Sequence, residues 1–157
     1  MGGSGQTDRA PSGLATLIGM SAAGYSGTPL AKKLGIKAEH RVALLQAPSG
    51  FEDQLDGLPE GVTITRGLRG TREFDVICCF AKREKRLQEQ LPRCIDRLAD
   101  RGGLWIAWPK KASGVPTELS DGLVREIGLG TGLVDNKVCA IDMVWSGLRF
   151  VRRLGKK

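Results

Sequence analysis

The sequence has few residues of the types that build metal sites and disulfide frameworks. Its 157 residues include one histidine, His40, and four cysteines, with no Cys-x-x-Cys pair. A zinc site needs several such ligands at short spacing, so we assign no metal ligands. Cys78 and Cys79 are adjacent in an apolar run and are expected to point to opposite faces of a strand. Free buried thiols are typical of a reducing compartment, which predicts a cytoplasmic protein.

Long apolar runs and aromatic residues are also scarce. No stretch approaches the roughly 20 apolar residues that span a bilayer, which argues against a membrane protein. Aromatic residues make up 5% of the chain, whereas hydrophobic residues make up 41%. Aliphatic side chains must therefore supply most of the burial, as they do in sheets covered by helices on both faces. The length fits one domain with its own core.

Negative charge is in the minority. The chain has 24 Lys and Arg against 17 Asp and Glu, which gives a formal net charge of +7 at pH 7. Such a basic protein attracts phosphates and nucleic acid, although the same charge also serves solubility. No basic motif interleaved with aromatic residues accompanies it, so nucleic-acid binding is an alternative that we do not favour.

The order of elements predicts the fold. Residues 1–23 are rich in Gly, Ser and Ala and are expected to be a disordered extension, with a single α/β domain over residues 24–157. Strands are expected at 41–46, 62–65, 74–80 and 104–108, and a terminal hairpin at 137–141 and 148–151.

Helical signals alternate with these strands. They are Thr28-Pro29 with Gly35, a capping box over Ser49-Gly-Phe-Glu52, the apolar spacing from Leu87 to Leu98, and a Ser120-Asp121 cap. Alternation favours right-handed crossovers, hence a Rossmann-like three-layer domain with a mainly parallel sheet and a C-terminal antiparallel hairpin. Residues 66–73 are too few for a helical crossover, so the order and direction of the second strand stay open.

Two resemblances accompany this order. The second half, with strand 74–80, the Gly102-Gly103 strand and the terminal hairpin, resembles the S-adenosylmethionine-dependent methyltransferase fold. That resemblance implies a glycine-rich loop after the first strand and an acidic residue at the end of the second, which binds the cofactor ribose. Here the first strand is followed by 47–50, Ala-Pro-Ser-Gly, and Thr65-Arg66 stands where the acidic residue would be. An arginine suits a phosphate or carboxylate ligand. We therefore assign no cofactor.

Five short segments carry the second resemblance: Gly24-Tyr-Ser-Gly-Thr-Pro-Leu30, Lys33-Leu-Gly-Ile36, Ala107-Trp-Pro-Lys-Lys-Ala-Ser-Gly114, Asp135-Asn-Lys-Val138 and Trp145-Ser-Gly-Leu148. Together they resemble a small, uncharacterised bacterial family known only as a domain of unknown function, and this resemblance implies no mechanism.

A candidate site follows from the topology. In open α/β sheets, ligands bind outside the carboxyl ends of the strands. Lysines, serines and a helix N-terminus gathered there would suit a small anion. Alternatively, the tryptophans pack in the core and the lysines are solvated, as we expect for the basic helix face at 82–86. The candidate ligand-binding residues are Ser49, Gly50, Trp108, Lys110, Lys111, Ser113, Trp145 and Ser146.

We therefore predict a Rossmann-like binding module for a small anionic or phosphorylated ligand or a partner protein. The sequence does not decide whether it is an enzyme, and no catalytic residue is assigned, because His40 lies before the first strand, away from the candidate site. The alternatives are a reduced S-adenosylmethionine-dependent methyltransferase and a nucleic-acid-binding protein. The sequence carries no expectation for the oligomeric state.

Overall fold

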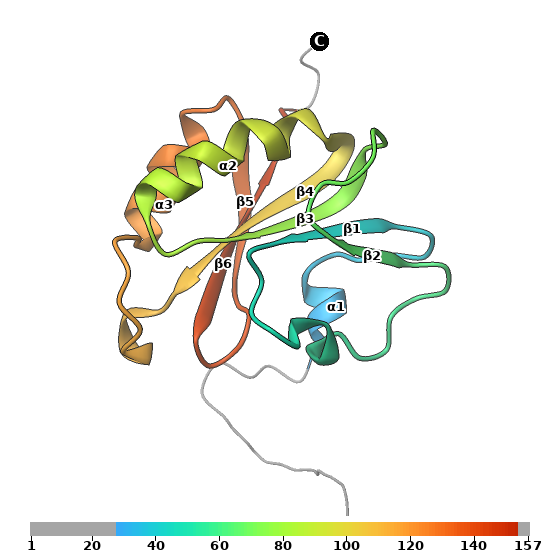
Figure 1. Cartoon of the computed structure of the whole chain (residues 1–157), viewed down its shortest axis with the longest axis horizontal. Coiled ribbons are helices and arrows are strands. Elements are labelled where there is room, and N and C mark those ends of the chain that lie inside the picture. Colours follow the sequence, from blue (N-terminus) through green and yellow to red (C-terminus); the bar gives the residue numbers. More distant parts are fainter. Residues whose placement is uncertain (1–27, 154–157) are drawn as a thin grey trace, which may run out of the picture.

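A computed structural model describes residues 28–153, which form one six-stranded mixed sheet with helices on both faces (Figure 1). The strands are β1 (Arg41–Leu45), β2 (Thr63–Arg66), β3 (Phe74–Phe80), β4 (Leu98–Pro109), β5 (Val134–Ala140) and β6 (Trp145–Val151). Their order across the sheet is β2-β1-β3-β4-β6-β5. The first four are parallel, whereas β6 is antiparallel to both β4 and β5.

The helices complete three layers. They are α1 (Leu30–Lys33), α2 (Glu84–Asp96) and α3 (Asp121–Leu129), with short 3-10 turns η2 (Phe51–Gln54) and η3 (Lys111–Ser113). The buried residues of α2 and α3 pack on one face of the sheet, and those of α1 and η2 pack on the other. The predicted Rossmann-like three-layer domain, mainly parallel with an antiparallel hairpin, is confirmed.

Strand β3 shows why this sequence makes a central strand. Its apolar side chains alternate between the two cores, with Ile77 and Cys79 facing α2 and α3 while Val76 and Cys78 face α1 and η2. The adjacent cysteines therefore point to opposite faces, as predicted. Burial raises the pKa of the Cys78 thiol to about 12, so this thiol stays protonated at neutral pH.

The structure gives the order and direction of β2, which the sequence left open. Strand β2 lies parallel to β1 at one edge of the sheet, and residues 67–73 return to β3 without a helix. Arg97 organises this return, because its guanidinium donates hydrogen bonds to the carbonyls of Leu68 at 2.8 Å, Arg69 at 3.0 Å and Arg72. Strand β2 has only four residues, so an extended segment is long enough to cross back.

Several predicted boundaries differ from the structure. The capping box at 49–52 is wrong, because η2 has no side-chain cap and Gly50 precedes it with φ 77°. Helix α2 ends at Asp96, whereas the predicted helical spacing runs on to Leu98, which is the first residue of β4. Strand β4 begins at Leu98, before the glycine pair, with an irregular register against β3. The hairpin strands are longer than predicted, so Trp145 lies at the start of β6 and not in the turn.

The predictions for the N-terminal region are tested only in part. The predicted extension at residues 1–23 lies outside the described residues. Helix α1 begins at Leu30, one residue later than predicted, with Pro29 at the N-cap position. Of the helices in residues 28–153, none is long and apolar enough to cross a bilayer.

Candidate functional site

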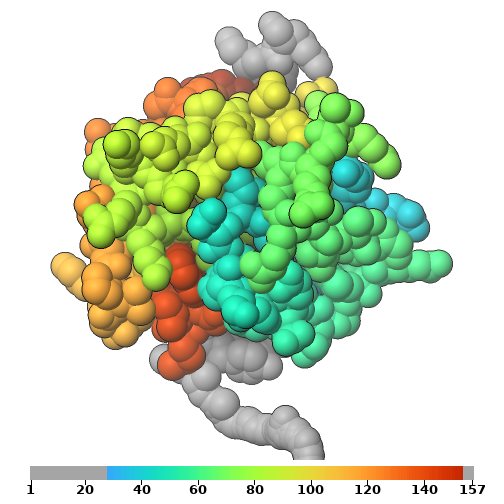
Figure 2. Space-filling model, in the orientation of Figure 1, coloured from blue at the N-terminus to red at the C-terminus, as the bar shows by residue number. Residues whose placement is uncertain are grey.

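A cavity of about 370 Å³ opens at the carboxyl ends of β1 and β3. In Figure 2, the teal segment after β1, the yellow-green segment after β3 and the red-orange hairpin meet on the face in view. The cavity therefore lies at the edge of the sheet where the sequence predicted a ligand site. Its lining residues are Gln46, Pro48, Phe80, Ala81, Lys82, Arg83, Arg86 and Trp145.

Aromatic rings form the apolar part of this cavity. The Phe80 ring lies edge-to-face against Phe51 and against Trp145, with ring centroids 5.0 Å apart in both pairs. Phe80 is 1% exposed and Trp145 is 8% exposed, so both rings are held by packing. Because the rings come from η2, β3 and β6, the cavity wall joins segments that are distant in the sequence.

The loop after β1 has a tightly specified backbone. Gln46 follows the last residue of β1 with φ 59°, a left-handed conformation that costs a residue with a side chain roughly 1–2 kcal/mol. Gly50 adopts φ 77° shortly afterwards, where the missing Cβ removes the penalty. Non-glycine residues hold such a conformation only when their surroundings impose it.

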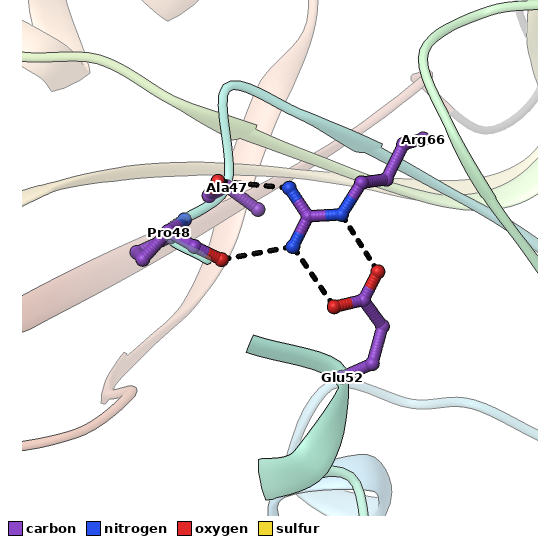
Figure 3. Close-up of polar contacts among 4 residues, drawn as sticks. All are labelled: Ala47, Pro48, Glu52 and Arg66. Carbon is purple, nitrogen blue, oxygen red and sulfur yellow. Dashed lines mark hydrogen bonds and ion pairs between the residues drawn. The ribbon is translucent and has the colours of Figure 1, made fainter. Parts of the chain in front are cut away.

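Arg66, the last residue of β2, holds the residues that follow Gln46 from the neighbouring strand (Figure 3). Its guanidinium donates hydrogen bonds to the carbonyl of Ala47 at 2.9 Å and to the carbonyl of Pro48 at 2.8 Å. It also binds both carboxylate oxygens of Glu52, at 2.7 and 2.8 Å. We call Arg66 with these three partners the Arg66 clamp.

The clamp extends the ionised state of Glu52 to lower pH. The hydrogen bond from Arg66, a backbone hydrogen bond and the arginine charge lower the pKa of the Glu52 carboxyl to about 2. The sequence predicted that Arg66 suits a carboxylate ligand, and the carboxylate that it meets is the chain's own Glu52. An ionised carboxylate thereby lies beside the end of β2, although β2 itself ends on arginine.

Positive side chains line the opposite side of the cavity. Lys82 and Arg83 follow β3 directly, and Arg86 lies in the first turn of α2. All three are exposed. The charge pattern predicted that residues 82–86 lie on the exposed face of a helix, but α2 begins only at Glu84 and these cations border the cavity. The rule that places ligand sites at carboxyl ends, applied to the residues after β3, would have identified them.

The loop after β4 anchors this basic segment. The Thr117 hydroxyl donates to the carbonyl of Lys82 at 2.7 Å, and a Glu118 oxygen accepts from the backbone N–H of Glu84 at 2.9 Å. The second Glu118 oxygen lies 3.7 Å from the Arg83 guanidinium. Within residues 28–153, no carboxylate forms an ion pair with Lys82 or Arg86.

The structure separates the two tryptophans that the sequence placed together. Trp145 lines the cavity, whereas Trp108 is packed in the core on the opposite face of the sheet. The reason is the register of β4 and β6, in which Trp108 pairs with Ser146 and Pro109 pairs with Trp145. Neighbouring pairs in a strand point to opposite faces. Trp108 and Ser146 are therefore near the cavity in sequence but are not part of its lining.

The other predicted site residues lie near the same edge but outside the lining. Ser49 and Gly50 are exposed in the loop beyond Pro48. Lys110 is half-buried with its backbone N–H bound to Val144, and Lys111 is exposed. The Ser113 hydroxyl donates to the Lys110 carbonyl at 2.7 Å and accepts from the Val115 N–H, an arrangement that closes a local turn. Their ligand-binding role stays a prediction. In the described part of the chain, no three His, Cys, Asp or Glu side chains gather as a metal site would need.

Comparison with known proteins identifies the fold. No family model matches the sequence, and no curated protein matches it. The complex of DhpI with SAH superposes with a TM-score of 0.58 at 12% identity, over 80% of this chain and 83% of that one. Fibrillarin from Aeropyrum pernix, with natively bound S-adenosyl-L-methionine, gives 0.54 at 16% identity, over 78% and 73%.

A SAM-dependent methyltransferase from Aquifex aeolicus gives a TM-score of 0.53 at 14% identity, over 77% of this chain and 86% of that one. Identities this low show the fold alone. They support the distant resemblance to the methyltransferase fold, whereas no comparison supports the resemblance to the small bacterial family.

Proposed function

We propose that this chain is a small methyltransferase that binds S-adenosylmethionine in the cavity at the carboxyl ends of β1 and β3. The position of that cavity carries the proposal, because DhpI and the Aeropyrum fibrillarin share the fold and were solved with SAH or S-adenosyl-L-methionine. A volume of about 370 Å³ falls within the usual range for small-molecule sites, roughly 300–1,000 Å³.

The residues present fit such a ligand. Pro48 and the accessible edge of Trp145 offer an apolar surface over the buried Phe80 ring, and the Arg66 clamp holds the loop that borders it. The Glu52 carboxylate, which lies outside the cavity lining, accepts two hydrogen bonds from Arg66 and one from the backbone, and so keeps one of its four lone pairs to accept from a ribose hydroxyl. In this proposal Glu52 replaces the acidic residue that the fold resemblance places at the end of the second strand. When bound, the methyl donor supplies a methyl group on a positively charged sulfur.

The test is calorimetric titration of the full chain with S-adenosylmethionine and with S-adenosylhomocysteine. We expect micromolar binding of at least one of them, and loss of that binding in Ala81→Leu, because Ala81 lines the cavity. Ala112→Leu, at an exposed position outside the lining, is the control for the added side chain. Because Ala81 itself is 4% exposed, the thermal midpoints of both variants are measured to show that they stay folded. No binding to the folded parent protein at millimolar ligand, or equal loss in both variants, would contradict the proposal.

A second candidate function is binding of a small anion, without catalysis, at Lys110 and Lys111, which the sequence predicted as ligand-binding residues. The observation that favours it is charge: among the described residues, neither Lys110 nor Lys111 has a carboxylate within ion-pair distance. Titration with inorganic phosphate tests it. Loss of phosphate binding in Lys110→Ala/Lys111→Ala, at an unchanged thermal midpoint, supports this function, whereas unchanged binding removes these lysines from the site.

A further inference from the structure

Three cations on one side of the cavity repel one another. Lys82, Arg83 and Arg86 lie within five positions of each other, and all three are exposed at the cavity. No Asp or Glu is among the lining residues. Cations gathered at one site give it a positive potential, which favours the binding of an anion.

Two arginines away from these three cations have close carboxylate partners. Arg66 binds Glu52 at 2.7 Å, and Arg125 binds Asp135 at 2.9 Å. At the cavity, only Arg83 has a carboxylate partner in the described chain, Glu118, at 3.7 Å between two exposed side chains. Such an exposed pair contributes little and leaves most of the positive potential in place.

The Glu118 carboxylate occupies the N-terminal end of α2, so an anionic ligand cannot bind there. It accepts the backbone N–H of Glu84 and so covers the start of α2. The side chains of Lys82 and Arg86 are therefore the groups available to a ligand, beside the apolar surface formed by Pro48 and Trp145. A ligand that satisfies both surfaces has an apolar body and a negatively charged group.

We infer that Lys82 and Arg86 form the binding subsite for the anionic group of an acceptor substrate, a small molecule with a phosphate or carboxylate on an apolar body. The assignment as acceptor rests on the proposed function, in which the methyl donor occupies the side of the same cavity next to the Arg66 clamp. The Arg86 guanidinium presents paired N–H donors that match the geometry of either anion, and Lys82 adds a second charge.

Phenyl phosphate is the probe, with benzyl alcohol as its uncharged counterpart, in titrations followed by the indole N–H signal of Trp145 in nitrogen-correlated NMR spectra. We expect saturable binding of phenyl phosphate and none of benzyl alcohol. Lys82→Ala/Arg86→Ala should weaken phenyl phosphate at least tenfold. Lys85→Ala/Arg93→Ala is the control: it removes the same charges from exposed positions of α2 outside the lining, and should change binding less than twofold.

Titration of both variants with S-adenosylmethionine separates this inference from the proposed function. Unchanged methyl-donor binding in Lys82→Ala/Arg86→Ala supports the acceptor subsite. Equal loss of both ligands would overturn it, because the cations would then hold the carboxylate of the methyl donor. Failure of the parent to bind phenyl phosphate also overturns it. If the parent binds phenyl phosphate but no methyl donor, the proposed function fails and the anion subsite stands.

Phosphate and carboxylate are distinguished by repeating the titration with benzoate. A macromolecular polyanion is a separate outcome, tested with a single-stranded oligonucleotide at two salt concentrations. Binding that falls steeply with salt and is lost equally in both double variants would overturn the subsite, since it would show that the basic surface acts as a whole.

Discussion

Replacing Phe80 by leucine tests whether the aromatic cluster holds the cavity wall together. The ring makes two edge-to-face contacts, with Phe51 and with Trp145, both at 5.0 Å between centroids. Each such contact contributes about 0.5–1.5 kcal/mol beyond burial. Loss of part of the ring volume from a site that is 1% exposed adds about 1 kcal/mol. We therefore expect the free energy of unfolding to fall by about 2–4 kcal/mol.

Urea denaturation at 25 °C measures this change. With a slope of about 2 kcal/mol per molar urea, the midpoint should fall by about 1–2 M while the slope stays the same. A double-mutant cycle of Phe80→Leu with Trp145→Leu isolates the contact between the rings, and the coupling should be about 0.5–1.5 kcal/mol. A loss below about 1 kcal/mol at an unchanged slope, or no coupling, would refute the view that the rings support each other.

Three further changes test local features. The pKa of Glu52 in the folded protein is lowered to about 2, so the ionised carboxylate stabilises the fold fully above the ordinary carboxyl range near pH 4, and this contribution disappears as the pH falls toward 2. Glu52→Gln should therefore lower the thermal midpoint at pH 7 but much less at pH 2. Ser120→Ala should cost about 1 kcal/mol in urea denaturation, since the Ser120 hydroxyl caps α3, whereas Ser49→Ala, with no capping bond, should cost almost nothing. Gly128→Ala should be strongly destabilising by the same measurement, because the new Cβ would lie 2.2 Å from the Phe150 ring; a change within 0.5 kcal/mol, of the size seen at ordinary surface positions, would contradict this packing.

The sequence predicts the elements whose signals are local. Strands β1, β3 and β4 are apolar on both faces because helices cover both sides of the sheet, and such runs are recognisable without knowing their partners. The Ser120 cap is equally local, since its hydroxyl binds the backbone N–H of Leu123, three residues along. The capping box predicted at Ser49 and Glu52 does not form, because the Glu52 side chain binds Arg66, which is 14 residues away and belongs to strand β2.

The same distinction applies to the candidate site. The carboxyl edge of the sheet follows from the order of elements, and the cavity lies there. Which side chains share it depends on strand register, and no local pattern shows that Trp108 and Trp145 face opposite ways. The cations after β3 look like a solvated helix face until the start of α2 is fixed.

The strand order has a consequence for how the protein reaches its native state during synthesis. Strand β5 is made before β6, yet among the strands of residues 28–153 its only neighbour is β6, which also supplies the outer partner of β4. The parallel half therefore keeps an unpaired edge, and β5 has nothing to pair with, until β6 has been made and inserted between them. Trp145 arrives with that strand, so the cavity acquires its last wall at the same moment. Pairings between segments so distant in the sequence form slowly, and the exposed edge of β4 is the surface most open to wrong pairing in the interval.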